Sequence, residues 1–262
     1  MRKATEQDLP VILPFLRAQV SDCLYMYIDI GKYGLSNSAM DVWVDEDEKG
    51  LSLVVMKYHT SISFQSRDDS WDLDGVAKLI EEFRPKSITA PEAMVRRLEP
   101  MFEAQYEIEY GNVYSFTDYT NIELDVKIDR ASEEETLEIA RLIKTDPGIG
   151  AYYDEQDLAD QLAERMRTGM GRSYVIRDQG RIVTHIASYA EFDGLATTGG
   201  LIVAPEYRTT LYGAYIEKYL VDTLNAEGYN VYTFVTTKLR KRLLKAMGNQ
   251  CVGTYGKMMI RE

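Results

Sequence analysis

Hydrophobic residues recur at helical spacing in three places in the first 120 residues. One helix is predicted over residues 8–20, where apolar side chains return every three or four positions. A second is predicted over 73–83, because Pro85 follows and the residue before a proline disfavours helix. A third is predicted to run from Pro91, which suits the first turn of a helix, to residue 102.

Strand-like patterns lie between and after these helices. The runs MDVWVDED (40–47) and GLSLVVMKYHTSISFQS (50–66) are rich in β-branched and aromatic residues. They predict a β-meander with an acidic turn at 45–48. A further strand is predicted over 104–119, interrupted at Gly111.

The second half has helix, meander, helix and strand in a similar order, and the seam between the halves is predicted near Thr120-Asn121. The strand IELDVKI (122–128) comes first. A helix follows, and the capping-box spacing of Ser132 and Glu135 marks its start. Another helix is predicted over 154–169.

Three further strands joined by the tight turns QGR and DGL predict an antiparallel meander. They are RSYVIRD (172–178), IVTHIASYAEF (182–192) and ATTGGLIV (196–203). After them come a helix that ends at Gly228, the strand NVYTFVTT (230–237), the helix KLRKRLLKAM (238–247) and the strand CVGTYGKMMI (251–260). In the short helix, Leu239, Leu243 and Met247 follow helical spacing and predict its core face.

The stretch LIVAPEYRTTLYGA (201–214) joins an apolar strand to an amphipathic helix. The backbone N–H groups from Thr209 to Ala214 are expected to be unpaired at the start of this helix, where the helix dipole favours an anion. Arg208 stands beside them. The pattern therefore predicts a phosphate-binding turn.

The order of elements from Ser132 to Ile260, together with this turn, resembles the GNAT superfamily of acyl-CoA-dependent N-acetyltransferases. In that family an apolar strand leads into V-x-P-x-Y-R-G-x-G-x-G, whose amides cradle the acetyl-CoA pyrophosphate while the strand backbone pairs with pantetheine. Thr209 and Leu211 occupy positions where the family has glycine, and the motif residues that match are Val203, Pro205, Tyr207, Arg208 and Gly213. A Rossmann unit is disfavoured, because antiparallel strands precede the turn and G-x-G-x-x-G is absent.

The resemblance implies an α+β fold with two GNAT-like domains, each a mixed, mainly antiparallel sheet flanked by helices. Residues 121–262 would form the acetyltransferase domain. Residues 1–120 would form a degenerate copy, because RDDSWDLDG (67–75) places carboxylates where phosphates need donors.

The resemblance also implies acetyl-CoA as the acyl donor. The residues expected to bind it are Leu201, Ile202, Val203, Arg208, Thr209, Thr210, Leu211, Tyr212, Gly213, Ala214 and Thr237. Leu244 stands where the family has a tyrosine that protonates the departing CoA thiolate, and leucine has no proton to give.

A catalytic base is expected on the strand 182–192, because the attacking amine must lose a proton. Period-two alternation places Val183, His185, Ala187, Tyr189 and Glu191 on one face. Glu191 resembles the strand-borne glutamate of some GNAT enzymes and is the predicted base; the alternative is that it only begins a solvated turn. His185 is expected to be a satisfied, half-buried side chain, and Tyr189 either lines the acceptor pocket or packs.

Composition restricts the partners. A net charge of −12 argues against a nucleic-acid surface and favours cationic over anionic partners; the alternative is that the charge serves only solubility. Cys23 and Cys251 are too few for a disulfide framework, and no histidines cluster near them to hold a metal. No segment has 18 consecutive apolar residues, so neither export nor a membrane is indicated and a cytoplasmic protein is expected.

Three functions are compatible with these observations. The first is an N-acetyltransferase in which the primary amine of a small molecule or peptide attacks acetyl-CoA directly. The second is a non-catalytic tandem GNAT-like protein that binds a ligand or partner. The third is a Fem-like aminoacyl transferase, which also pairs two GNAT-type folds but for which no basic tRNA-binding surface is present. Binding of acetyl-CoA to the purified protein separates the first two.

Overall fold

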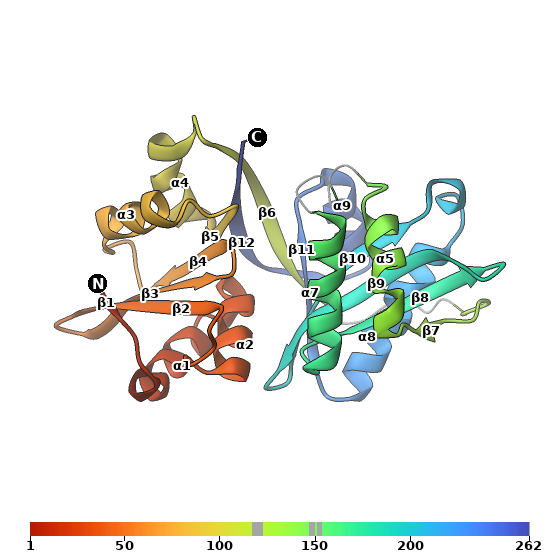
Figure 1. Ribbon diagram of the computed structural model, residues 1–262, viewed down its shortest axis with the longest axis horizontal. Coiled ribbons are helices and arrows are strands. Elements are labelled where there is room, and N and C mark those ends of the chain that lie inside the picture. Colours follow the sequence, from red (N-terminus) through yellow and green to blue (C-terminus); the bar gives the residue numbers. More distant parts are fainter. Residues whose placement is uncertain (117–122, 147–149, 151–153, 262) are drawn as a thin grey trace. The chain divides into compact units, whose positions relative to one another are not determined.

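The structure is a computed structural model that describes residues 1–116, 123–146, 150 and 154–261. It divides into two compact units, each shown in Figure 1. The first comprises Met1–Tyr114, Phe234–Lys245 and Cys251–Glu262, and the second comprises Ser115–Thr233 and Ala246–Gln250. This division differs from the predicted one, which placed a single boundary between residues 120 and 121, because two segments near the end of the chain belong to the first unit. The predicted seam at Thr120-Asn121 lies outside the described residues.

The first unit is a sheet covered by α-helices on both faces (Figure 1). Its strand order is β1-β2-β3-β4-β5-β12-β6. The pairs β1–β2, β2–β3, β3–β4 and β5–β12 are antiparallel, and β4–β5 is parallel. Its elements are β1 (Arg2–Lys3), α1 (Leu9–Arg17), α2 (Leu24–Tyr33), β2 (Met40–Asp47), β3 (Gly50–Tyr58), β4 (Ser61–Ser66), α3 (Leu73–Phe83), β5 (Ser87–Pro91), α4 (Glu92–Phe102), β6 (Tyr106–Phe116), α9 (Lys238–Ala246) and β12 (Gln250–Ile260).

Two of these elements differ from the expected pattern because tertiary packing decides them. α2 is buried on most of its surface, so it has no polar face to produce a helical period. β5 is only five residues long and ends at Pro91, which was expected to begin a helix and instead precedes α4. β5 is a strand because β4 and the distant β12 pair with it on its two sides.

Gly111 does not interrupt β6, which runs through it. A Cβ atom at Gly111 would lie 2.3 Å from the Tyr255 ring. Because Gly111 has no side chain, the Tyr255 ring of the neighbouring strand β12 can pack against its backbone, which is a recognised use of glycine in a strand.

The second unit is a mixed sheet of order β11-β10-β9-β8-β7. α5 and α7 lie on one face and α8 on the other (Figure 1). Its elements are β7 (Asp129–Arg130), α5 (Thr136–Ile143), α7 (Glu155–Arg167), β8 (Arg172–Asp178), β9 (Arg181–Phe192), β10 (Leu195–Val203), α8 (Tyr212–Ala226) and β11 (Asn230–Val235). None of the helices in the described residues is long and apolar enough to span a membrane.

The antiparallel meander predicted for this unit is confirmed. β8, β9 and β10 pair in an antiparallel sense. The two-residue turns Gln179-Gly180 and Asp193-Gly194 both have positive φ at each position, as tight hairpins require. β10 and β11 pair in parallel, joining Leu195–Thr198 to Asn230–Thr233, as the helical crossover predicted.

Two other predictions for the second half are wrong. IELDVKI is not a strand over its described residues 123–128, and the short β7 follows it instead. In α9 the predicted core face is reversed, because Leu239 and Leu243 are exposed while the neighbouring Leu244 is fully buried. The Ser132–Glu135 capping box is present, and it caps a single 3₁₀ turn that leads into α5.

Candidate functional site

The predicted anion-binding turn lies between the end of β10 and the start of α8. A short 3₁₀ turn (Pro205–Tyr207) follows β10, and α8 begins at Tyr212. The ring of Tyr207 stacks on that of Tyr212, with centroids 5.8 Å apart, so the two ends of the turn are held together.

Part of the turn's hydrogen-bonding capacity is used internally. The Thr210 hydroxyl donates to the Tyr207 carbonyl at 2.7 Å and accepts from the Tyr212 amide at 3.2 Å. The Thr210 amide also donates to the Tyr207 carbonyl. The hydroxyl of Thr210 is therefore committed to the turn and is not available as an extra phosphate donor.

Other amides of the turn have no acceptor among the described residues. Within the part of the chain that the structure describes, the N–H groups of Thr209, Leu211, Gly213 and Ala214 have no hydrogen-bond partner. They lie at the N-terminal end of α8, where the helix dipole is positive. This arrangement can hold an anion.

Thr209 and Leu211 replace the family's glycines without backbone strain. Neither has a positive φ, and Leu211 has φ −86°. Glycine's conformational freedom is therefore not needed at these positions. The Leu211 side chain is 57% exposed, so it does not fill the turn from within.

Arg208 and Gly213 connect the turn to the end of β10. The Arg208 guanidinium donates from Nε to the Val203 carbonyl at 3.3 Å, and its Nη2 lies 3.8 Å from Asp146. A Cβ atom on Gly213 would lie 3.3 Å from Val203 Cγ2. The start of α8 thus packs closely on the last residue of the strand.

Two β-bulges lie close together along the β9–β10 ladder, and the sequence patterns did not predict them. Thr197 of β10 pairs with Ala190 of β9, and Thr198 of β10 pairs with Ser188 of β9, which makes Tyr189 an extra residue of β9 in the ladder. On β10, Gly199 pairs with Ala187 and Ile202 with His185, so the residues between them make a second irregularity. The Gly-Gly pair inside ATTGGLIV is the signal that indicates such a bulge.

His185 lies beneath the second bulge and is completely buried. Its Nδ1 donates to the Gly200 carbonyl at 3.0 Å, and its Nε2 lies 3.2 Å from the Ser173 hydroxyl. A carbonyl only accepts, so the proton of the neutral ring is on Nδ1. Burial lowers the pKa of His185 to about 4, although the hydrogen bond to the Gly200 carbonyl raises it in part. The expected half-buried histidine is therefore a fully buried one that fixes Gly200.

Glu191 does not share a face with His185, because the bulge at Tyr189 shifts the period-two alternation. It is buried on the α8 face, where it accepts a bidentate ion pair from Arg172 at 2.9 and 2.5 Å and a hydrogen bond from Ser188. Arg172 also pairs with Glu227, at the C-terminal end of α8. Glu191 is thus close to the end of α8 opposite the turn, and the helix between them is about 22 Å long.

Thr237 and Leu244 belong to the first unit. The Thr237 hydroxyl accepts weakly from the Arg240 amide at 3.4 Å, at the start of α9. Leu244 is fully buried. A tyrosine placed there would overpack the site, so Leu244→Tyr is not a clean test for a missing acid.

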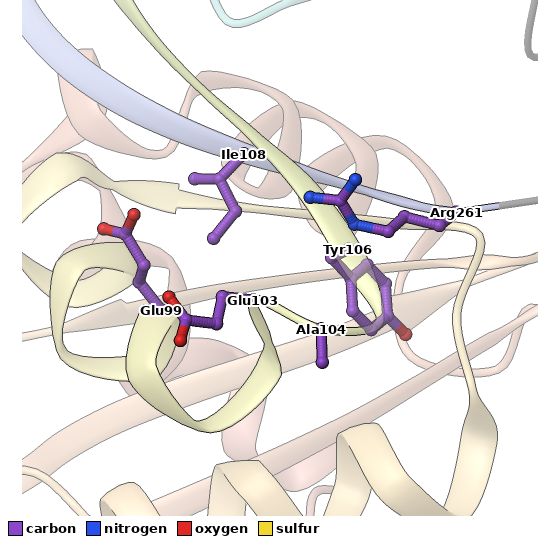
Figure 2. Close-up of a pocket in the computed structure, with 6 residues that line it drawn as sticks. All are labelled: Glu99, Glu103, Ala104, Tyr106, Ile108 and Arg261. Atoms are coloured by element: carbon purple, nitrogen blue, oxygen red, sulfur yellow. The ribbon is translucent and has the colours of Figure 1, made fainter.

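A pocket of about 400 Å³ lies in the first unit, beside the C-terminal end of α4 (Figure 2). Glu99 and Glu103 present carboxylates from the α4 side, and Arg261 extends its guanidinium on the other side of the pocket. The Glu99 carboxylate accepts from the Tyr110 hydroxyl at 2.5 Å. Burial, together with that bond, raises the pKa of Tyr110 to about 12. None of the predicted site residues lines this pocket.

No protein-family model matches the sequence, and a comparison with curated proteins gave no match. Among solved structures, the chain is similar to a GCN5-related N-acetyltransferase from Sphaerobacter thermophilus, with 14% identity, a TM-score of 0.61 and coverage of 98% of this chain and 93% of that one. It is also similar to a GNAT-family acetyltransferase from Colwellia psychrerythraea, with 12% identity, a TM-score of 0.59 and coverage of 99% of both.

A third similar structure is a tandem GNAT protein from the clavulanic acid biosynthesis pathway. The identity is 12% and the TM-score 0.59, over 98% of this chain and 96% of that one. Likeness at such identities establishes the fold and not the reaction. The chain has the α+β fold of the GNAT superfamily.

Proposed function

We propose that the protein is an acetyl-CoA-dependent N-acetyltransferase that acylates a primary amine. The observation that carries the proposal is the set of unpaired amides at the start of α8, next to Arg208 and at the end of a bulged strand. A helix N-terminus alone is common, but here it stands in a fold similar to that of GNAT acetyltransferases. It also stands at the position where the sequence resemblance places the acetyl-CoA pyrophosphate.

The residues of the turn fit a pyrophosphate. Arg208 supplies a positive charge, and the amides of Thr209, Leu211, Gly213 and Ala214 supply donors. Leu201, Ile202 and Val203 run from the β10 bulge to the turn, a span of about 10 Å along a strand. Their backbone would pair with the pantetheine arm. Acetyl-CoA bound there supplies an activated acyl group.

The acceptor is an amine, with cationic molecules favoured by the net charge of −12. The amine nitrogen attacks the thioester carbonyl, the C–N bond forms, the C–S bond breaks, and the nitrogen loses a proton. Glu191 as the base for that proton stays a prediction. Its carboxylate is engaged by Arg172 and Ser188, so this role requires the ion pair to open.

Calorimetry with acetyl-CoA tests the proposed function directly. We expect one site, and we expect adenosine 3′,5′-bisphosphate to compete for it. Absence of binding by the folded wild-type protein would refute the proposal.

Replacing Arg208 by alanine should weaken acetyl-CoA binding about tenfold, because one charge-assisted hydrogen bond to the pyrophosphate is lost. The side chain is half exposed, so the protein should remain folded. Arg167→Ala is the matched control, because Arg167 is exposed and pairs with Glu133 away from the turn. Equal affinities of the Arg208 and Arg167 variants in calorimetry would remove Arg208 from the site.

A non-catalytic binding protein is the second candidate. The observations in its favour are the buried Leu244 at the family's tyrosine position and the ion-paired state of Glu191. Such a protein would bind acetyl-CoA without releasing thiol in the presence of any amine.

A further inference from the structure

The two neighbouring bulges give Tyr189 a position that regular pairing of β9 and β10 would not give it. Tyr189 is the extra residue of β9, between Ala190 and Ser188. Further along the same ladder, the register shifts again at Gly200 and Leu201 of β10. Bulges re-aim side chains, and they recur beside active sites.

The Tyr189 ring occupies the space that side chains at Gly199 and Gly200 would take. A Cβ on Gly199 would lie 2.6 Å from Tyr189 Cε2, and a Cβ on Gly200 would lie 2.2 Å from the Tyr189 hydroxyl oxygen. Gly200 also has φ +62°, a conformation that favours glycine. The glycine pair therefore brings the phenol oxygen directly onto the β10 bulge.

Neighbouring groups hold this arrangement in place. His185 fixes the Gly200 carbonyl from below at 3.0 Å. Arg165 of α7 donates to the Tyr189 carbonyl, and its guanidinium carbon lies 5.9 Å from the centre of the Tyr189 ring. The ring therefore lies on the α7 face of the sheet, opposite the face that carries Glu191. Buried or part-buried groups thus preorganise the position of the tyrosine.

We propose that Tyr189 is the catalytic acid that protonates the departing CoA thiolate, and that it takes the place of a tyrosine at position 244. This proposal rests on the proposed acetyltransferase function. The phenol oxygen stands at the bulge, about 10 Å along β10 from the turn that holds the pyrophosphate, where the acyl end of a strand-paired pantetheine arm would come to lie.

The proton balance is closed without another reactant. As the amine nitrogen bonds to the acyl carbon and the C–S bond breaks, the phenol gives its proton to sulfur and CoA leaves as a thiol. The phenolate then takes up the proton that the nitrogen loses, directly or through water, and Tyr189 returns to its starting state. In this scheme the phenolate, and not Glu191, receives that proton. The net reaction converts a thioester and an amine into an amide and a thiol.

Tyr189→Phe tests the proposal, because it keeps the ring on the two glycines and removes only the hydroxyl. Tyr219→Phe is the matched control, since Tyr219 is a part-buried tyrosine of α8 whose ring packs on Tyr174 on the other face. Thiol release from acetyl-CoA would be followed with putrescine, tyramine and a lysine-containing peptide as acceptors, and thermal melts would confirm that both variants fold.

We expect Tyr189→Phe to lower kcat about 100-fold, the contribution of a positioned general acid, and Tyr219→Phe to leave it unchanged. The wild-type pH profile should also lose activity as tyrosine ionises at high pH, and this limb should vanish from the residual activity of Tyr189→Phe.

A second readout needs no turnover. Calorimetric affinity for acetyl-CoA should fall about fivefold in Tyr189→Phe, while affinity for adenosine 3′,5′-bisphosphate, which lacks the acyl arm, should not change.

The outcomes separate this inference from the proposed function. If wild type binds acetyl-CoA and turns over, but Tyr189→Phe keeps full kcat, the same pH profile and the same acetyl-CoA affinity, the catalytic role of Tyr189 is wrong and the acetyltransferase stands. If wild type binds acetyl-CoA and releases no thiol with any of the amines, the catalytic role is also wrong and the binding protein is favoured. If wild type binds neither ligand, the proposed function itself fails.

Discussion

Replacing Arg172 by leucine should lower the free energy of unfolding by about 3–5 kcal/mol, the largest effect expected in the second unit. The reason is that Glu191 is only 6% exposed and depends on Arg172 for its compensating charge. Without Arg172 the buried carboxylate keeps, among the described residues, the hydrogen bond from the Ser188 hydroxyl and no compensating charge. Urea unfolding at neutral pH measures the change.

A matched control uses an exposed ion pair of the same unit. Arg181 pairs with Glu206, and both side chains are about half exposed. Arg181→Leu should therefore cost no more than about 1 kcal/mol. The double variant Arg172→Leu/Glu191→Leu should recover much of the loss, since it removes the uncompensated charge as well. Equal losses for Arg172→Leu and Arg181→Leu would show that Glu191 is not held as a buried ion.

The second large effect is a loss of stability in mild acid that His185 causes. Burial lowers its pKa from the ordinary 6.5 to about 4 in the folded protein. As pH falls, the unfolded chain takes up this proton before the folded protein does. The contribution of His185 to the free energy of unfolding is therefore fully present above pH 6.5 and is lost as pH falls towards 4. The difference in pKa corresponds to about 3 kcal/mol.

The measurement is urea unfolding at several values between pH 7 and pH 4, for wild type and His185→Gln. We expect the wild-type curve to fall more steeply over that range, with the extra loss absent from His185→Gln. His59→Gln is the control, because His59 is the other histidine of the chain and its side chain is exposed. Parallel curves for wild type and His185→Gln would contradict a buried neutral His185.

Local sequence patterns were sufficient for many elements of the second unit. The hairpin turns Gln179-Gly180 and Asp193-Gly194 combine residues that tolerate positive φ, so each fixes a two-residue connection by itself. α8 carries its own amphipathic period and starts after a turn of polar residues. The parallel pairing of β10 with β11 followed from the helix between them.

The candidate site was predicted only in part. The turn from Arg208 to Ala214 is a contiguous stretch, so its residues follow from the chain alone. The expectation that every amide from Thr209 to Ala214 is unpaired was wrong for Thr210 and Tyr212, whose amides donate within the turn. The face on which Glu191 lies did not follow, because one extra residue at Tyr189 shifts the alternation for every position after it. A period-two pattern assumes regular pairing and cannot show where a bulge occurs.

By itself, therefore, the sequence determined most helices, the hairpins and the position of the turn between β10 and α8, since each depends on residues within about one or two turns of chain. Only the tertiary structure decided that β12 completes the sheet of the first unit and that Tyr189 lies on Gly199 and Gly200. Strand pairing and bulges depend on partners distant in the chain, and their free energy comes from contacts that no local pattern records.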